Sequence, residues 1–388
     1  MKAIVNGLIY TMENEEVIEK GSILIDGGKI IKVGKNIDLP KDVEVIDAKG
    51  NLVLPGFIDA HCHLGMWEEG IGQEGSDGNE GVDPVTPHLR AIDAINPMDE
   101  AFFESYSNGV TTAITGPGSA NVIGGMFAAV KTYGKRIDDM ILKDPIAMKV
   151  AFGENPKRFY SAQNTSPVTR MGSVAMLREM LLKTIDYMKR KEAAGEDLTK
   201  MPKKDIKLEA LIPVINKEIP IKAHAHRADD IFSALRVAKE FDLDITLDHC
   251  TEGHLIVDEL KKENKPAIIG PTMTNRSKFE LQNQSFETPK ALNEAGLLIA
   301  ITTDAPVIPL KHLSLCAGLA YKEGLSEMEA LKAITINPAI ITGISDRVGS
   351  IKEGKDADIV IYDKNPIKDV DFNTLLTMIN GEVVYKLN

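Results

Sequence analysis

Histidine and aspartate side chains stand at the ends of several apolar, strand-like runs of this chain. His61 and His63 close the first run, and because side chains alternate along a strand, both imidazoles lie on one face. Three later runs end on comparable side chains: His224 followed by His226, His249, and Asp304. Imidazole and carboxylate groups bind metals, so the pattern predicts that side chains from separate strands meet at a metal.

A barrel is the arrangement that brings such strand ends together. Strand-like runs alternate with helical segments, and eight runs are candidate barrel strands: Phe57 to Ala60, Val110 to Thr115, Met126 to Tyr133, Ile146 to Phe152, Ile219 to His224, Ile245 to Asp248, Pro266 to Ile269, and Leu298 to Thr303. The third run reads equally well as the start of a helix. Apolar residues at helical spacing predict helices over 228–241 and 326–336. Right-handed crossovers would close parallel strands into a (β/α)8 barrel, whose strand C-termini share one face.

Two insertions and two β-rich ends complete the layout. Residues 65–96 hold the only tryptophan, Trp67, and are too long and irregular for a simple connection, so we expect them to cover the barrel mouth. Residues 155–218 contain a predicted amphipathic helix over 171–193. Both ends of the chain are rich in short β runs, with hairpin signals at Asp26-Gly27-Gly28 and Asn380-Gly381. One small β domain built from both termini is therefore expected.

Composition narrows the possible partners and location. The net charge is -12, and no basic stripe is present that could neutralise phosphates, which argues against a nucleic-acid partner. The first residues show no signal peptide, and no apolar run is long enough to span a membrane, so a cytoplasmic protein is expected. Three irregularly placed cysteines (Cys62, Cys250 and Cys316) predict reduced thiols rather than a disulfide framework.

Two motifs carry a family resemblance. The run from Pro55 to His63 (PGFIDAHCH) resembles the first-strand signature of the amidohydrolase superfamily, and the run from Gly349 to Asp358 (GSIKEGKDAD) resembles its return to the β domain. Within that superfamily the layout is most similar to the imidazolonepropionase and prolidase-like branch. The resemblance implies a distorted (β/α)8 barrel over residues 55–343 that holds one or two divalent metals. It also implies a urease-like β-sandwich from residues 1–54 and 344–388, and at least a dimer.

The resemblance also implies roles for individual residues. Carried over onto this sequence, the ligands are His61, His63, His224, His249 and Asp304. Such a set suits zinc, with manganese, iron or nickel as alternatives. A bound metal would lower the pKa of water from about 15.7 towards about 7 and polarise a carbonyl group. Asp304 would take the proton of that water and pass it to the departing nitrogen.

The carboxylate expected from the fourth strand has two candidates. Binuclear members of the superfamily usually supply a carboxylated lysine there, and others use a glutamate. Lys149 falls in the middle of the run, whereas Glu154 follows its end, at the depth where ligands belong. We favour Glu154 as the ligand, and carboxylated Lys149 is the alternative.

Substrate contacts are predicted from the loops after the strands. Asn155 and Arg158 follow the fourth strand, Asn275 and Arg276 follow the seventh, and these side chains could bind an anionic group such as a carboxylate. His226 is predicted to contact the substrate or to support a ligand. The substrate is expected to be a small molecule.

The predicted function is hydrolysis of a C–N bond in an amide or a cyclic amide. A metal-dependent dipeptidase and a deaminase of the same fold are the alternatives within the enzyme class. A catalytically silent scaffold is a remote third, because scaffolds lose ligands and every expected histidine is present in this chain.

Overall fold

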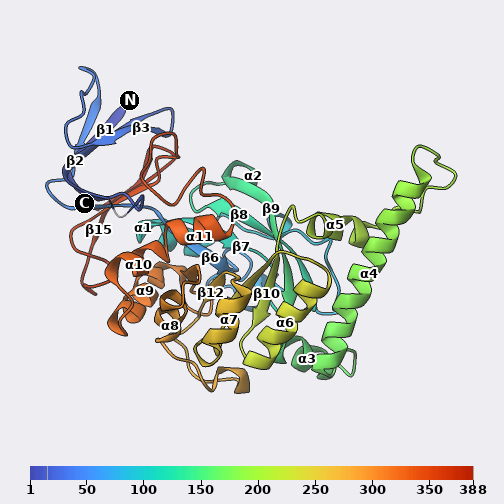
Figure 1. Cartoon of the computed structure of the whole chain (residues 1–388). Coiled ribbons are helices and arrows are strands. Elements are labelled where there is room, and N and C mark those ends of the chain that lie inside the picture. The colour runs from blue at the N-terminus through green and yellow to red at the C-terminus, as the bar shows by residue number, and fades with distance from the viewer. Residues whose placement is uncertain (15, 388) are drawn as a thin grey trace.

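Two eight-stranded sheets form the framework of the protein in a computed structural model, which describes residues 1–14 and 16–387. The barrel sheet runs in sequence order through β6 (Phe57–Cys62), β7 (Val110–Thr115), β8 (Ile123–Lys131), β9 (Ile141–Ala151), β10 (Ile221–Ala225), β11 (Ile245–His249), β12 (Ala267–Ile269) and β13 (Ile299–Ile301). All eight predicted strand regions are strands, including the third. Helices surround this sheet on its outer side (Figure 1).

The prediction of an all-parallel barrel is wrong at β8, which runs antiparallel to both β7 and β9. Parallel neighbours need a crossover of about a dozen residues or more. The link between β7 and β8 spans only residues 116–122, and the link to β9 holds one short helix, α2 (Ile137–Met140). Such connections can only turn the chain back on itself.

The ring is also not closed by direct strand pairing. No ladder joins β13 to β6 within the described residues. Instead, the segment after α10 (Glu327–Lys332) lies between them: the amide of Ile58 donates to the carbonyl of Ile334 at 2.8 Å, and the amide of Ile301 donates to that of Ala333 at 2.9 Å. The barrel is therefore TIM-like and nearly closed.

The helix predicted over 326–336 is two helices, α10 and α11 (Ile336–Ile341). A proline has no amide hydrogen, and its ring clashes with the carbonyl four residues earlier. Pro338 therefore prevents a continuous helix through Ile334. The carbonyl of Ile334 accepts from β6 instead, so the break contributes to barrel closure.

The two other predicted helices are present among the remaining helices of the structure. The remaining α-helices are α1 (Glu100–Ser107), α3 (Glu154–Ser161), α4 (Arg170–Ala194), α5 (Ile206–Ile215), α6 (Ala228–Glu240), α7 (Val257–Glu263), α8 (Thr288–Glu294) and α9 (Leu313–Lys322). The predicted helices over 228–241 and 171–193 correspond to α6 and α4. Figure 1 shows that the far end of α4 projects away from the barrel.

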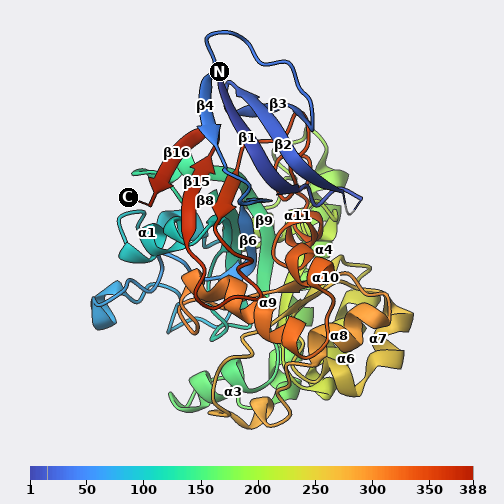
Figure 2. The same ribbon diagram turned by 90° about the vertical axis from the view of Figure 1, so that its left-hand side faces the viewer.

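Both ends of the chain build the second sheet. Its strands are β1 (Lys2–Tyr10), β2 (Val17–Asp26), β3 (Lys29–Gly34), β4 (Glu44–Asp47), β5 (Leu52–Pro55), β14 (Ile359–Tyr362), β15 (Thr374–Ile379) and β16 (Glu382–Lys386). β5 pairs antiparallel with β14, which joins the N-terminal and C-terminal strands (Figure 2). The two predicted hairpins join β2 to β3 and β15 to β16.

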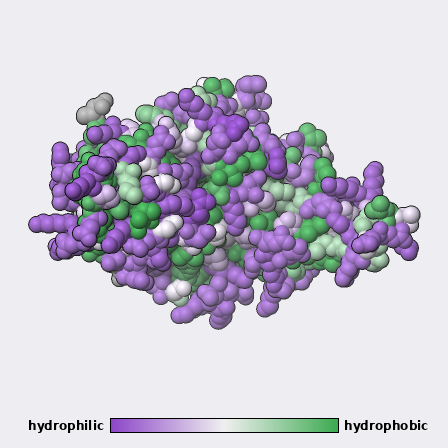
Figure 3. Space-filling model, turned by 90° about the horizontal axis from the view of Figure 1, so that it is seen from above, coloured by the Kyte–Doolittle hydropathy of each residue, from purple (hydrophilic) through white to green (hydrophobic). Residues whose placement is uncertain are grey.

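The surface is largely hydrophilic in the view from above, with scattered apolar groups (Figure 3). In the part of the chain that the structure describes, no helix has both the length and the apolar character needed to cross a membrane. Cys62, Cys250 and Cys316 are buried free thiols, as predicted.

Candidate metal centre and active site

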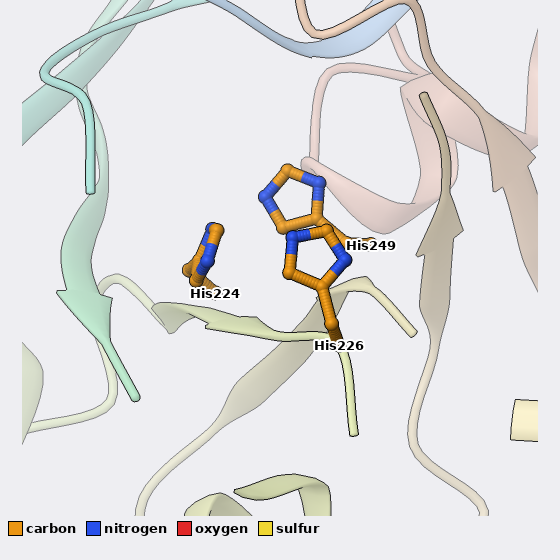
Figure 4. A group of neighbouring side chains, drawn as sticks. All are labelled: His224, His226 and His249. Carbon is orange, nitrogen blue, oxygen red and sulfur yellow. The ribbon is translucent and has the colours of Figure 1, made fainter. Parts of the chain in front are cut away.

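The predicted side chains meet at the C-terminal ends of the barrel strands. His61 lies in β6 and His63 directly follows it, His224 lies in β10, and His249 ends β11. Ligand atoms of His224, His226 and His249 lie within 4.8 Å of one another, as do those of His61, His249 and Asp304. Figure 4 shows the first three rings gathered from the ends of two neighbouring strands. Because His249 belongs to both groups, they form one continuous centre.

Hydrogen bonds on the outer side of the centre orient two imidazoles, and a carboxylate lies close to a third. Nδ1 of His63 donates to the carbonyl of Gly116 at 2.7 Å, and Nδ1 of His249 donates to the carbonyl of Gly270 at 2.7 Å. Nδ1 of His61 lies 2.6 Å from the carboxylate of Asp248. Carbonyls and carboxylates only accept, so the proton sits on Nδ1 and each Nε2 presents a lone pair, as in metal-binding histidines.

The free atoms of the centre suit a divalent cation. His224 Nδ1, His249 Nε2 and Asp304 Oδ1 are buried, and none has a hydrogen-bond partner among the described residues. Buried polar atoms without partners are costly, and a metal would satisfy all three. Burial also lowers the pKa of His61, His224, His226 and His249 well below the usual histidine value, so these rings are neutral at pH 7 and able to bind a metal.

Asp304 lies at the floor of the cavity and is positioned through its backbone. Its carboxylate is 3.1 Å from Nε2 of His63 and 3.5 Å from Nε2 of His61. Its φ of +54° is in the left-handed region. Buried Asp59 stabilises the preceding turn, because it accepts from the amide of Thr303 at 2.9 Å and from the hydroxyl of Thr302 at 2.5 Å.

Lys149 lies within this centre. It is fully buried, and its Nζ is 3.0 Å from Nε2 of His61. Desolvation lowers its pKa to about 8. A second buried lysine nearby, Lys222, differs because it has an anionic partner: its Nζ is 3.1 Å from the carboxylate of Asp248 and donates to the carbonyl of Ala60.

The structure does not bring Glu154, the favoured fourth-strand ligand, into the histidine groups. Glu154 begins α3, and its carboxylate lies 3.8 Å from Arg158 and accepts from the amide of Glu280 at 3.4 Å. The chain turns into a helix directly after β9, which directs this side chain along α3 rather than inward. Lys149 therefore occupies the position that the sequence analysis assigned by preference to Glu154.

Glu280 is a carboxylate of the centre that the sequence analysis missed. It is buried, and its Oε1 lies 3.8 Å from Nε2 of His224 and 3.7 Å from Nε2 of His226. The amide of Glu154 donates to its Oε2 at 3.1 Å. Glu280 sits in a single turn of helix over Phe279–Leu281, away from any strand end in the sequence, so no sequence signal marked it.

A cavity of about 560 Å³ opens above the histidines. His226, Asn155 and Asn275, three of the residues predicted to contact the substrate, line it. The predicted insertion contributes Trp67 and Asn79 to the wall, and the indole of Trp67 packs edge to face on His63, with ring centroids 4.9 Å apart.

The two predicted arginines are engaged elsewhere. The side chain of Arg158 is 71% exposed, and its guanidinium faces Glu154. The guanidinium of Arg276 donates to the carbonyls of Gln282 and Gln284 and so stabilises its own loop. Neither lines the cavity, whereas Lys278, which the sequence analysis did not single out, does.

Comparisons with known proteins agree with this fold. A sequence model of the amidohydrolase family matches residues 216–384. The crystal structure of an amidohydrolase from Thermotoga maritima MSB8 superposes with a TM-score of 0.96 at 40% identity, over 100% of both chains. The imidazolonepropionase of Thermoanaerobacter pseudethanolicus is 24% identical over 91% of this chain and 86% of its own length.

The amidohydrolase tasK of Hapsidospora irregularis is 30% identical over 89% of this chain, but the chain spans only 38% of the length of that relative. The chain belongs to the amidohydrolase family, because it is 40% identical to the Thermotoga maritima amidohydrolase over the full length of both chains. The resemblance to the imidazolonepropionase-like branch is confirmed, and the family assignment indicates a hydrolase.

Proposed function

We propose that this protein is a metal-dependent hydrolase that cleaves a C–N bond in an amide or cyclic amide of a small molecule. The observation that carries the proposal is the meeting of neutral, buried imidazoles and a carboxylate around atoms that have no other described partner. That donor set suits a divalent cation. Among the cavities found in the described residues, only one is lined by both Asp304 and His224, and the donor set lies at its floor.

The ligands in this proposal are His61, His63, His224, His249 and Asp304, with zinc as the metal that suits them best. We propose carboxylated Lys149 as the fourth-strand carboxylate, in place of Glu154. The neutral amine attacks carbon dioxide, a N–C bond forms, and one proton leaves, which creates a carbamate anion. The lowered pKa of Lys149 supports this step because it makes the neutral amine available near pH 8.

Asp304 acts as the general acid and base. A divalent cation in the centre would lower the pKa of water and polarise the scissile carbonyl. Asp304 accepts the proton that water loses on attack and then donates it to the departing nitrogen, which completes the cleavage. Its position in the cavity lining, 3.1 Å from Nε2 of His63, supports this role.

Replacement of Asp304 by asparagine tests this role. Asp304→Asn should lower kcat by about 10²-fold to 10⁴-fold, which is the usual contribution of a positioned acid/base group. Turnover is measured on a panel of amides, dipeptides and cyclic amides, with amine and ammonia release followed separately and metal content determined on the same samples. Release of ammonia alone would identify a deaminase instead, and a metal-free native protein without turnover would identify a scaffold.

We also propose two domains, with the barrel over residues 55–343 and the terminal sheet from residues 1–54 and 344–388. The pairing of β5 with β14 supports this division. Hydrogen exchange should then show the terminal sheet opening separately from the barrel, and opening of all strands in a single step would contradict it.

A further inference from the structure

Lys278 carries the amine that faces the cavity above the histidines. It lies between β12 and α8, just before a single turn of helix at Phe279–Leu281. Its side chain is 29% exposed, and its Nζ donates to Oδ1 of Asn155 at 2.7 Å. An ammonium has three donor hydrogens, so this contact leaves others for a ligand.

The other cations near the centre cannot take this role. Lys149 and Lys222 are buried among the strands, beneath the cavity floor. Arg158 and Arg276 lie outside the cavity lining. Among the described residues that line the cavity, Lys278 is therefore the only lysine or arginine.

The ammonium of Lys278 lies close to the candidate metal centre. Its Nζ is 3.7 Å from Oε1 of Glu280, and that same oxygen is 3.8 Å from Nε2 of His224. Asn155 forms a second link, since its Nδ2 lies 3.2 Å from the same atom of His224. The distance between Nζ of Lys278 and Nε2 of His224 therefore cannot exceed the sum of their two distances to Oε1 of Glu280. A molecule the size of one amino acid can bridge that distance.

The side chains that contact Lys278 fix the position of its ammonium group without fully neutralising its charge. Asn155 is uncharged, and its amide is itself fixed because Nδ2 donates to the hydroxyl of Ser119 at 2.7 Å. The Glu280 contact, at 3.7 Å, is longer than a charge-assisted hydrogen bond. Met273 and Leu281 supply apolar wall beside the amine.

We propose that Lys278 binds the free carboxylate of the substrate, and that the substrate is an N-acyl amino acid or a dipeptide with an apolar side chain. This inference rests on the proposed function, because it places the scissile C–N bond at the histidines. The carboxylate then takes the remaining donors of Lys278, one residue's length from that bond, while the apolar wall receives the side chain. A neutral amide of the same shape loses this contact.

The single tryptophan makes the binding step measurable without turnover. Trp67 packs on His63 at the cavity wall, so its fluorescence reports occupancy of the cavity directly. The probes are matched pairs of N-acetyl-L-methionine, N-acetyl-L-leucine and glycyl-L-leucine with their C-terminal amides. Each pair differs only in the charge at the carboxyl end, and each is titrated into the zinc-loaded protein.

Wild-type protein should bind each acid about 10-fold to 100-fold more tightly than its amide, which is the usual effect of one charge-assisted hydrogen bond. Lys278→Met should remove that difference, and Lys278→Arg should restore most of it. Lys262→Met, which removes an exposed lysine from α7, is the matched control and should leave the difference unchanged. Thermal unfolding of each variant verifies that it is folded.

The outcomes separate this inference from the proposed function. Binding that depends on Lys278 without release of amine would refute the hydrolase and keep the carboxylate site. Hydrolysis with equal binding of acids and amides, or with a preference that survives Lys278→Met, would overturn the role of Lys278. Failure of the wild-type protein to bind any acid of the panel would overturn it as well.

Discussion

Lys149 and Lys222 are both buried, but only Lys222 has a carboxylate, that of Asp248, as a direct partner. Both lie within about 6 Å of the ring of Phe127, with Nζ at 5.6 Å and 5.5 Å from its centroid. Lys222 has the carboxylate of Asp248 as a partner, which keeps a charged ammonium favourable at a buried site. Lys149 faces an imidazole nitrogen instead, and desolvation outweighs the opposing charges of Asp248 and Asp304, which lowers its pKa to about 8. Its amine is the one available for reaction with carbon dioxide.

This difference predicts a pH dependence for metal uptake. A lysine whose pKa is lowered to about 8 is mostly protonated below that pH and mostly neutral above it. Carboxylation needs the neutral form, so metal-free protein supplied with zinc and bicarbonate should recover metal faster as pH rises from about 7 to about 9. Uptake is followed by metal analysis, and ¹³C-bicarbonate should label a carbamate visible by NMR.

Two variants locate the carboxylate. Lys149→Met should lower metal affinity by at least about 10-fold, which is the usual loss on removal of a ligand or its support. Glu154→Gln is the matched control and should bind metal as the native protein does. The reverse pattern would return the ligand role to Glu154.

At the scale of elements, the insertion after β6 and the loop after β7 fix the cavity wall by close packing on Trp67. Gly78 and Gly118 approach the indole so closely that an added Cβ would lie 1.9 Å and 2.7 Å from its ring atoms. Glycine is required at both positions, because any side chain would displace the ring. The insertion thereby keeps Trp67 against His63.

Gly78→Ala should therefore move Trp67 away from His63. We expect a fluorescence change and a loss of about 1–3 kcal/mol in the free energy of unfolding, as for other overpacked sites. Chemical denaturation measures the second quantity. Gly81→Ala in the same insertion is the control, because the added Cβ would meet only a ring carbon of Phe159 at 3.7 Å, which is an ordinary contact. Equal effects from the two variants would contradict the packing argument.

The terminal segment and the barrel are joined by buried ion pairs. Asp356 accepts from Arg347 at 2.9 Å, lies 3.0 Å from Nζ of Lys131 in β8, and lies 2.5 Å from Lys29 in β3. Burial alone would raise the pKa of Asp356, but these cations outweigh it and lower the pKa to about 2. The charged form is thus stabilised in the folded protein relative to the unfolded chain.

The sign of this shift predicts an acid-sensitive contribution to stability. The contribution is present above the unfolded value of 3.8 and is lost as pH falls towards about 2. Asp356→Asn should lower the free energy of unfolding at pH 7 by about 2 kcal/mol, because it removes the carboxylate that Arg347, Lys29 and Lys131 share. Denaturation between pH 7 and pH 2 should show that the difference in free energy of unfolding between wild type and Asp356→Asn becomes smaller in acid. The control variant Asp42→Asn, at an exposed position, should match wild type at every pH.

At the scale of the whole molecule, the candidate centre links strands that are far apart in sequence. Ligand atoms from β6, β10 and β11 and from Asp304, the third residue after β13, lie close together. The ring between β13 and β6 lacks direct pairing among the described residues, so a cation that binds His61 and Asp304 would join its two sides. Metal binding should therefore stabilise the fold as well as support the chemistry.

Removal of the metal should lower the thermal unfolding temperature. A ligand that binds only the folded state adds about 2.7 kcal/mol at a concentration 100 times its Kd. Calorimetry of chelator-treated protein should show this loss, and added zinc should reverse it in a concentration-dependent way. Identical unfolding temperatures with and without metal would show that the centre binds no cation in the native protein.

The sequence alone determined the strands, the family and the positions of the histidines relative to the strands. Alternation along a strand places His61 and His63 on one face whatever the rest of the chain does, and motif spacing is a local property. The tertiary structure decided what depends on loop paths. Short connections force β8 to run antiparallel, α3 directs Glu154 away from the histidines, and the segment between β12 and α8 brings Lys278 and Glu280 over the strand ends. Loops without periodicity carry no sequence signal for such placements, because only packing against the barrel selects their path.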